Sequence, residues 1–173
     1  MSSEFTSSGI SFESLGNSGE FMKMLMENIC SCVLILNDKM ELQAFNNAMK
    51  TIFANKPDED LYYKRCGEAI GCAHTVKEMK ECGKTSKCKY CELRESAMIS
   101  YLEKKPIYRK KMDREFFIND KKKEMKHLQF STRPIYFKNE YYILLIIEDI
   151  SRVVEQNHLI KLQQEQIKKL SMN

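Results

Sequence analysis

Four cysteines lie within one twenty-residue stretch and constrain the fold of this chain more than any other feature. They are Cys72, Cys82, Cys88 and Cys91, in the pattern C-x9-C-x5-C-x2-C. The surrounding segment, residues 66–91, holds three of the six glycines and little apolar periodicity. Such a segment buries little apolar surface by itself, and a bound metal would compensate with ligand bonds. The spacing is typical of a zinc or iron–sulfur site.

Cys88 and Cys91 are the firmest pair of candidate ligands. A C-x-x-C pair at the start of a helix can chelate one ion, and the helix N-terminus favours thiolates. Cys82 and Cys72 lie close enough in the chain to complete a set of four. A structural zinc site usually has two C-x-x-C pairs and this segment has one, so we favour an iron–sulfur cluster over zinc. His74 is a substitute ligand, and a reversible Cys88–Cys91 disulfide is a further alternative.

The other three of the seven cysteines fall outside this set. Cys30 and Cys32 open a predicted strand with both side chains on one face, where we expect small buried apolar groups. The alternative is that one of them supplies a fifth ligand or a thiol that faces the cofactor. Cys66 is expected to be a free thiol. His127 and His158 have no partner that the sequence names, and we treat both as structural.

Composition and charge bound the class of protein. A length of 173 residues suits one domain, and a hydrophobic fraction of 43% allows it a core. The net charge is only +4 and the basic runs are short and mixed with acids, which argues against a nucleic-acid partner. The N-terminus has no secretory pattern, and no apolar run approaches the roughly 20 residues that span a bilayer. We therefore expect a cytoplasmic protein without a membrane partner, where clustered thiols are usually metal ligands or redox groups.

Catalytic motifs are not recognisable in the sequence. It contains no Ser/His/Asp or Cys/His arrangement with a supporting motif, and no glycine-rich loop for phosphate. A thiol enzyme would need such a constellation around its nucleophile. We therefore expect a protein that is not an enzyme.

Hydrophobic periodicity predicts both helices and strands. Residues 1–18, rich in Ser and Gly, predict a flexible arm. Helices are expected over residues 21–29, 48–54, 90–102 and from 150 to the end, with Asn46-Asn47 capping the second. Strands are expected over residues 32–36, 41–45, 115–118, 125–137 and 141–147, and the last should be central and buried on both faces.

The C-terminal helix carries a weak heptad pattern. Val153, Ile160 and Ile167 are seven residues apart, Leu170 extends the stripe, and glutamines occupy intervening positions. Three heptads are too short to be stable alone, so the pattern predicts pairing with a second copy. We expect a homodimer held by the N- and C-terminal helices, with packing of the last helix on its own domain as the alternative.

Two motifs resemble the PAS sensor domain. Val33–Asp38 followed by Leu42–Ala48 resembles the first PAS hairpin and the helix after it, and Tyr142–Ser151 resembles the last PAS strand and its junction with an outgoing helix. The resemblance implies an α+β fold, with a five-stranded antiparallel sheet, helices on one face, an N-terminal helix and a C-terminal coiled-coil-like helix. It divides the chain into an arm (1–18), a sensor domain (19–149) and a signalling and dimerisation helix (150–173).

The cysteine segment resembles a subset of bacterial PAS domains that share its Gly67–Cys72, Cys82-Gly83 and Cys88–Cys91 motifs. The resemblance implies a sensory input module for an output domain that this chain does not contain. The cofactor would lie in the cleft between the sheet and the helices. Asp149, at the junction after the last strand, would pass its state to the C-terminal helix.

The expected function is the sensing of redox state or of a gas through a cysteine-ligated metal cofactor, with an iron–sulfur cluster favoured over zinc. A flavin or haem in the same cleft stays open, although no residue argues for either. The alternatives are a zinc-stabilised module for dimerisation or partner binding, and a thiol–disulfide redox switch.

Overall fold

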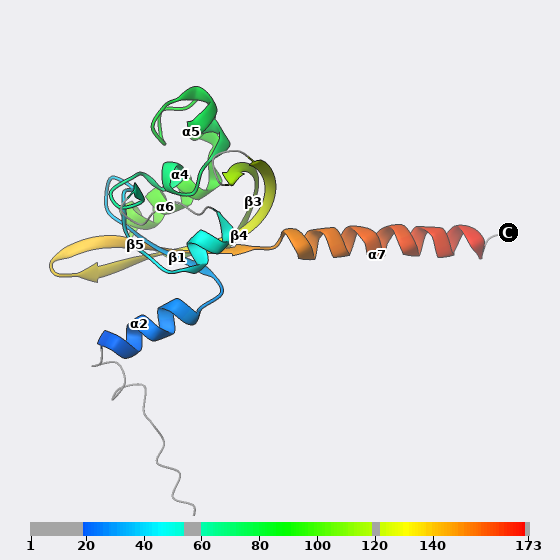
Figure 1. The fold of residues 1–173 in the computed structure, drawn as a ribbon, viewed down its shortest axis with the longest axis horizontal. Helices are drawn as coiled ribbons and strands as arrows, with labels where there is room; N and C mark the ends of the chain where they lie inside the picture. Colours follow the sequence, from blue (N-terminus) through cyan, green and yellow to red (C-terminus); the bar gives the residue numbers. More distant parts are fainter. Residues whose placement is uncertain (1–18, 54–59, 119–121, 172–173) are drawn as a thin grey trace, which may run out of the picture.

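The computed structural model describes residues 19–53, 60–118 and 122–171. One antiparallel sheet carries helices on one side, and a long helix leaves the domain at the C-terminal end (Figure 1). The elements in chain order are α2 (Gly19–Asn28), β1 (Cys32–Leu36), β2 (Leu42–Phe45), α3 (Ala48–Ile52), α4 (Cys66–Ala69), α5 (Ala73–Glu78), the 3-10 turn η2 (Cys88–Tyr90), α6 (Glu92–Glu103), β3 (Ile107–Ile118), β4 (Lys122–Phe137), β5 (Glu140–Asp149) and α7 (Ser151–Leu170).

The sheet has five strands in the order β2-β1-β5-β4-β3. Neighbours in the chain form the antiparallel pairs β1–β2, β3–β4 and β4–β5, and β5 returns to pair with β1. β5 is central: Leu145 lies opposite Leu34 of β1 on one side and Thr132 of β4 on the other. The predicted α+β fold with a five-stranded antiparallel sheet is therefore confirmed.

The core lies between the inner face of the sheet and α6. Ile143, Leu145 and Ile147, alternate residues of β5, are completely buried. The Thr132 hydroxyl of β4 donates a hydrogen bond of 3.3 Å to the carbonyl oxygen of Ser96, which ties the sheet to α6. The alternation of apolar and polar residues along these strands gives the sheet one face that can pack against helices.

The strand before the last hairpin is longer than predicted. β3 begins at Ile107 rather than at Glu115, and along its length only Met112 and Phe116 are buried. The first half of β3 is charged, so it shows no apolar alternation. Pairing with β4 along one side makes it a strand, and a charged sequence suits the edge of a sheet.

The prediction that the last strand is buried on both faces is wrong. Tyr142, Leu144 and Ile146, on the second face of β5, are only half-buried. This face of the sheet looks away from α6 and α4 (Figure 1). β-branched and aromatic residues identified a central strand correctly, but they do not indicate how many of its faces are covered.

The prediction that Asn46-Asn47 caps α3 is also wrong. Asn47 occupies the N-cap position in a helical backbone conformation and makes no side-chain capping bond. The buried side chain of Asn46 instead holds the connection between α2 and β1. Its carbonyl oxygen accepts the Val33 N–H at 2.9 Å. Its amide group donates to the carbonyl oxygens of Met26 and Ser31, each at 3.0 Å.

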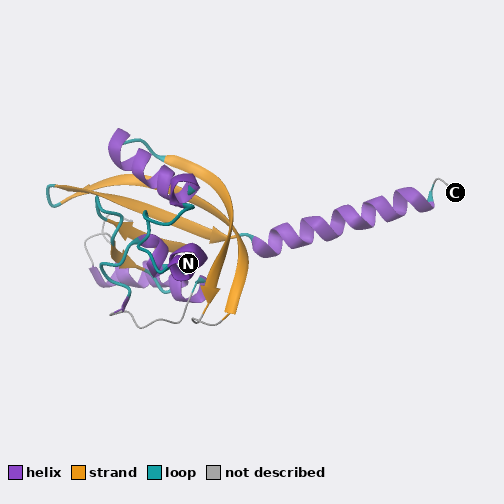
Figure 2. Cartoon of the chain, turned by 90° about the horizontal axis from the view of Figure 1, so that it is seen from above, coloured by secondary structure: helices purple, strands orange, loops and turns teal. Residues whose placement is uncertain are grey.

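Helices α2 and α7 stand at the margins of the domain (Figures 1 and 2). Neither contains a buried residue. The apolar side chains of the predicted heptad are exposed. α7 therefore does not lie along its own domain, which was the alternative to pairing. None of the described helices is long and apolar enough to span a membrane.

Two predicted features lie outside the described residues. They are the flexible arm over residues 1–18 and the end of the second helix at Ala54. The other predicted helices and strands, β3 excepted, are found within about three residues of their expected bounds.

Candidate functional site

The cysteine segment, residues 66–91, is joined to the edge of the sheet by its backbone. The carbonyl oxygen of Gly71 accepts the Phe117 N–H at 2.8 Å, and Cys72 forms an isolated antiparallel bridge with Phe116. Gly71 has a φ of +71°, and a side chain there would lie 2.6 Å from the carbonyl oxygen of Phe117. The glycine before Cys72 is therefore required by a close approach of two backbones.

Three cysteines line one small cavity against the first turns of α6. They are Cys66, Cys82 and Cys91, and Arg94 joins them. The cavity has a volume of about 20 Å³, which holds one water-sized occupant. The other lining residues are Leu36, Met40, Gly67, Leu93 and Ala97.

The loop that carries Cys82 is fixed to α4. A Cβ on Gly67 would lie only 2.7 Å from the Cys82 sulfur, so this glycine lets Cys82 pack directly against the helix. Arg65 donates to the carbonyl oxygen of Cys82 at 2.9 Å. The Cys82 N–H donates to the Glu68 carboxylate at 2.9 Å. Cys82 is therefore held beside Cys66 by contacts on both sides of its own backbone.

Cys88 sits among hydrogen-bond donors. Its sulfur accepts the Gly83 N–H at 3.0 Å and lies 2.9 Å from the Thr85 hydroxyl. Burial alone would raise the pKa of Cys88, but the Thr85 hydroxyl, the backbone donors and the charge of Arg94 outweigh it and lower this pKa. Cys88 is partly open to solvent, and its hydrogen-bond donors, rather than a helix N-terminus, shift its pKa downward.

The pKa values of the three cavity cysteines are shifted in the opposite direction, upward. Burial, with added repulsion from Cys82 and Cys91, raises the pKa of Cys66 well above its ordinary value. Burial also raises the pKa of Cys82 to about 11. Burial raises the pKa of Cys91, although the positive charge of Arg114 opposes this. In the metal-free chain these thiols are therefore protonated at neutral pH, including Cys91, for which a helix N-terminus had predicted the thiolate.

Two arginines flank the cysteines. Arg114, from β3, interacts electrostatically with Cys91 and Cys72; burial would lower its pKa, but these interactions outweigh it and raise this pKa. Its side chain is only 13% exposed, and it contacts the Glu92 carboxylate at 3.4 Å. On the other side Arg94 lies against Gly83, and its buried Nη1 has no hydrogen-bond partner within the described part of the chain. A buried guanidinium nitrogen without a hydrogen-bond partner costs free energy. A negatively charged neighbour would therefore stabilise Arg94.

The predicted ligands Cys72, Cys82, Cys88 and Cys91 are neighbours, but they do not form a finished metal site. Among the described residues, no three His, Cys, Asp or Glu side chains are placed to hold a metal ion together. All seven cysteines are free thiols. His74 lines a surface hollow whose other lining residues include no cysteine.

The remaining thiols differ from each other. Cys32 is completely buried in β1, as predicted, and burial raises its pKa to about 12. Cys30 is exposed and precedes the strand, so the prediction that both side chains are buried on one face is wrong for Cys30. Neither residue lines the cavity of Cys66, Cys82 and Cys91.

Asp149 lies where β5 meets α7. Its carboxylate accepts hydrogen bonds from the Lys126 ammonium at 2.8 Å and from the Ser151 hydroxyl at 2.6 Å. The Ser151 hydroxyl accepts the His127 N–H at 3.0 Å. The His127 ring nitrogen Nδ1 lies 2.7 Å from the Asp113 carboxylate of β3. Side chains from three strands therefore hold the start of α7, and His127 has a partner that the sequence does not name.

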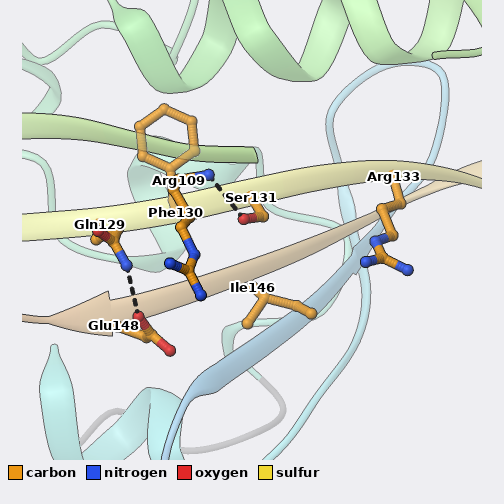
Figure 3. Close-up of a pocket in the computed structure, with 7 residues that line it drawn as sticks. All are labelled: Arg109, Gln129, Phe130, Ser131, Arg133, Ile146 and Glu148. Atoms are coloured by element: carbon orange, nitrogen blue, oxygen red, sulfur yellow. Dashed lines mark hydrogen bonds between the residues drawn. The ribbon is translucent and has the colours of Figure 1, made fainter. Parts of the chain in front are cut away.

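A second hollow, of about 210 Å³, lies on the sheet face that looks away from α6 (Figure 3). Gln129 donates to the Glu148 carboxylate at 3.0 Å, and the Ser131 hydroxyl accepts the Arg109 N–H at 3.0 Å. Because it lies on the other side of the sheet from the cysteines, we do not count it as part of their site.

Sequence reasoning missed several residues of the site. The spacing Thr85-x-x-Cys88 places a hydroxyl and a thiol within one turn, and this signal was available. Arg94 follows Cys91 by three residues on a predicted helix, which puts it on the same side as the cysteine. Arg114 and Cys66 reach the site through strand pairing and helix packing, for which no local pattern exists.

Neither a protein-family model nor a curated protein sequence matches this chain. Solved structures do. The PAS domain of nitrogen regulation protein NR(II) from Vibrio parahaemolyticus superposes with a TM-score of 0.52 at 14% identity, over 75% of this chain and 97% of that one. The PAS domain of an HTR-like protein from Haloarcula marismortui gives 0.51 at 12%, over 76% and 96%.

A third match extends further along the chain. An RNA-binding light-oxygen-voltage receptor superposes with a TM-score of 0.56 at 10% identity, over 95% of this chain but only 41% of the receptor. At these identities the likeness concerns the fold. The chain thus has the fold of PAS domains.

Proposed function

We propose that this chain is a sensory input module of the cytoplasm whose sensing element is its cysteine cluster. The observation that carries the proposal is the gathering of five cysteines, residues 66, 72, 82, 88 and 91, between Arg94 and Arg114 and beside β3. Clustered thiols in a reducing compartment serve as metal ligands or redox groups. The PAS fold supports an input role, because the matched structures include a receptor much longer than this chain.

The donor set fits a thiophilic metal held by Cys72, Cys82, Cys88 and Cys91, as the spacing predicts. Sulfur is the preferred ligand of zinc and of iron–sulfur clusters. A divalent ion with four thiolates carries two net negative charges, and two guanidinium groups flank the cysteines. Arg94 Nη1, buried without a partner, would then face a negative charge. The metal would supply a centre whose oxidation or loss changes the charge and packing of this region.

Zinc and an iron–sulfur cluster are the two candidate occupants, and the size of the cavity distinguishes between them. The cavity of about 20 Å³ has room for one ion as it stands. The favoured iron–sulfur cluster contains several atoms and would need the cysteines to move apart. Pockets for molecules of the size of flavin or haem measure roughly 300–1,000 Å³. Single-ion binding therefore needs the smallest rearrangement, and flavin or haem does not enter the proposal.

The signal would travel from the cysteines along β3 to α7. Arg114 interacts electrostatically with Cys91 and Cys72, and the preceding residue, Asp113, binds the ring of His127. The His127 backbone holds both Ser151 and the N–H of Ile150, at the start of α7. Any change at the cysteines that moves Arg114 would thus alter the junction at Asp149. We propose that α2 and α7 pair with those of a second copy and pass the change to an output partner.

Metal analysis of protein purified without air tests the proposal. An iron–sulfur occupant gives iron, sulfide and visible charge-transfer absorption, whereas a single zinc gives one equivalent of zinc and no colour. The double variant Cys88→Ser/Cys91→Ser should lose the metal, while Cys30→Ser, at an exposed thiol outside the cluster, should keep it. If the protein contains no metal and all its thiols titrate freely, the proposal of a bound metal is refuted. The Cys88–Cys91 disulfide switch would then remain as the proposed function of the cluster.

A further inference from the structure

We infer that the hollow of about 210 Å³ on the sheet face that looks away from α6 binds a small molecule through a doubly charged phosphate group, held by Arg109 and Arg133. The hollow lies on the other side of the sheet from the cysteine cluster. A ligand there does not depend on the function proposed for that cluster.

Strand pairing brings the lining of the hollow together. Gln129, Ser131 and Arg133 are alternate residues of β4, so their side chains share one face of the sheet. Ile146 of β5 lies opposite Ser131. Glu148 lies opposite Gln129. A cation, an amide, a hydroxyl and an apolar side chain from two strands therefore border the same space.

A β-bulge in β3 supplies a second cation. The register between β3 and β4 shifts between Ile107 and Lys110. Tyr108 and Arg109 therefore lie opposite the single residue Ser131. Arg109 has a φ of +49°, a left-handed conformation that suits glycine, and its N–H donates to the Ser131 hydroxyl at 3.0 Å. Such strain in a residue with a long side chain points to a use for that side chain.

Both guanidinium groups are available to an anion. Within the described ranges, no ion pair includes Arg109 or Arg133. Glu148, the carboxylate that lines the hollow, accepts a hydrogen bond from the Gln129 amide instead. The Arg133 guanidinium lies 5.1 Å from the centre of the Tyr108 ring, a cation–π contact that orients it and leaves its N–H groups for a ligand.

The charges of the hollow suit a phosphate group. The two guanidinium groups lie to either side of the Ile146 side chain (Figure 3), and a guanidinium binds phosphate oxygens through parallel N–H groups. Lys111 lies opposite Gln129 on the same face and adds a third positive charge. Glu148 contributes one negative charge, so a dianion balances the net charge of the site.

The size of the hollow favours a small ligand. Its volume is below the roughly 300–1,000 Å³ of pockets for drug-sized molecules, so a phosphate with a short organic stem suits it. Glu148 at its border would repel the further charges of a polyanion. We therefore assign the site to a small phosphate compound rather than to a nucleic acid.

Titration of the full chain with inorganic phosphate tests this site, with isothermal calorimetry as the measurement. The unaltered chain should bind one phosphate, less tightly as the salt concentration rises. Arg133→Gln should weaken binding by about tenfold or more, because a charge-assisted hydrogen bond is lost. Arg109→Gly should weaken it similarly without lowering the melting temperature, because glycine suits the backbone there. Lys110→Gln is the matched control, since Lys110 is the next residue of β3 but does not line the hollow.

Several results would overturn the assignment. An unaltered chain that binds no phosphate would do so, and so would equal weakening by Lys110→Gln, which would mean unspecific attraction to a basic surface. Tighter binding of succinate than of phosphate would replace the phosphate by a dicarboxylate. Tighter binding of a single-stranded oligonucleotide, weakened by Arg133→Gln, would assign the arginines to a nucleic acid. If Arg109→Gly fails to fold, Arg133→Gln still decides.

Discussion

Individual sulfurs in the cysteine segment differ because their neighbours differ. Cys88 has donors within hydrogen-bond distance, so its thiolate is favoured, whereas Cys66 and Cys82 are surrounded by apolar groups and other thiols. The Cys88 thiol therefore ionises more readily than the thiols of Cys66 and Cys82. Because thiols must lose protons to bind a metal, any metal affinity of the cluster should rise with pH.

Thr85→Val tests the environment of Cys88. Burial raises the pKa of this thiol, and hydrogen bonds led by that of the Thr85 hydroxyl more than reverse the effect. In metal-free protein, the pH midpoint of Cys88 alkylation should lie below the ordinary thiol value of 9.0. The variant should raise that midpoint by roughly one unit, the low end of what a hydrogen bond to a charged group contributes, since Cys88 is partly solvated.

Mass spectrometry of the alkylated protein over a pH series gives the midpoint. Thr51→Val is the control, because Thr51 is an exposed threonine of α3, outside the cysteine segment, whose hydroxyl donates to the carbonyl oxygen of Asn47. Equal midpoints in Thr85→Val and the unaltered chain would show that the hydroxyl does not stabilise the thiolate.

The same residues show how far sequence reasoning reaches. The spacing of cysteines located the segment and identified Cys82, Cys88 and Cys91 as neighbours, because local spacing limits how far these residues can separate. It did not show that Cys66, the first residue of α4, lines the same cavity as Cys82 and Cys91. Helix packing brings Cys66 there, and no local pattern in the sequence reports it.

At the scale of elements, β3 connects the site to the outgoing helix. Its second half was predicted from apolar residues, but its charged first half was not, because only pairing with β4 defines it. Asn46 is a second example. Its position before a helix predicted a cap, whereas its buried side chain bonds the connection between α2 and β1. The local pattern thus predicts elements well where one face is apolar, and fails where a neighbour supplies the hydrogen bonds.

Asp149→Asn tests the junction between β5 and α7. Burial would raise the pKa of Asp149, but hydrogen bonds from Lys126 and Ser151 outweigh it and hold this pKa below its ordinary value. A lowered folded-state pKa gives stability that is present above about pH 4 and is lost as the pH falls through the folded-state pKa. At pH near 7 the variant should lower the free energy of unfolding by about 1.5–3 kcal/mol.

Urea unfolding at neutral and acid pH measures the difference in the free energy of unfolding between the wild-type protein and Asp149→Asn. This difference should shrink as the pH falls below about 4, because the wild-type carboxyl is then neutral like the amide. Asp38→Asn, in the exposed turn between β1 and β2, should cost little at either pH. A cost for Asp149→Asn that stays constant with pH would mean that the charge of Asp149 does not stabilise the junction.

At the scale of the whole molecule, the two terminal helices present uncovered apolar surface. α7 has no buried residue, and its 20 residues leave the domain as an unsupported rod (Figure 2). An isolated helix of this length is marginal in water, since most helical stability in proteins comes from packing of an apolar face. A second copy would supply that packing along the stripe of Val153, Ile160 and Ile167.

Ile160→Lys tests this pairing. Ile160 is the central residue of the stripe, so a lysine there would place two like charges against each other across a parallel helix pair. Sedimentation equilibrium should show a dimer for the unaltered chain and a shift toward monomer for the variant, with reduced helix content by circular dichroism. His158→Lys adds a similar charge two residues away, on the opposite side of α7, and should leave the dimer intact. Equal weakening by both lysines would mean that charge in general, rather than the apolar stripe, controls association, and α7 would then need a different partner to carry a signal.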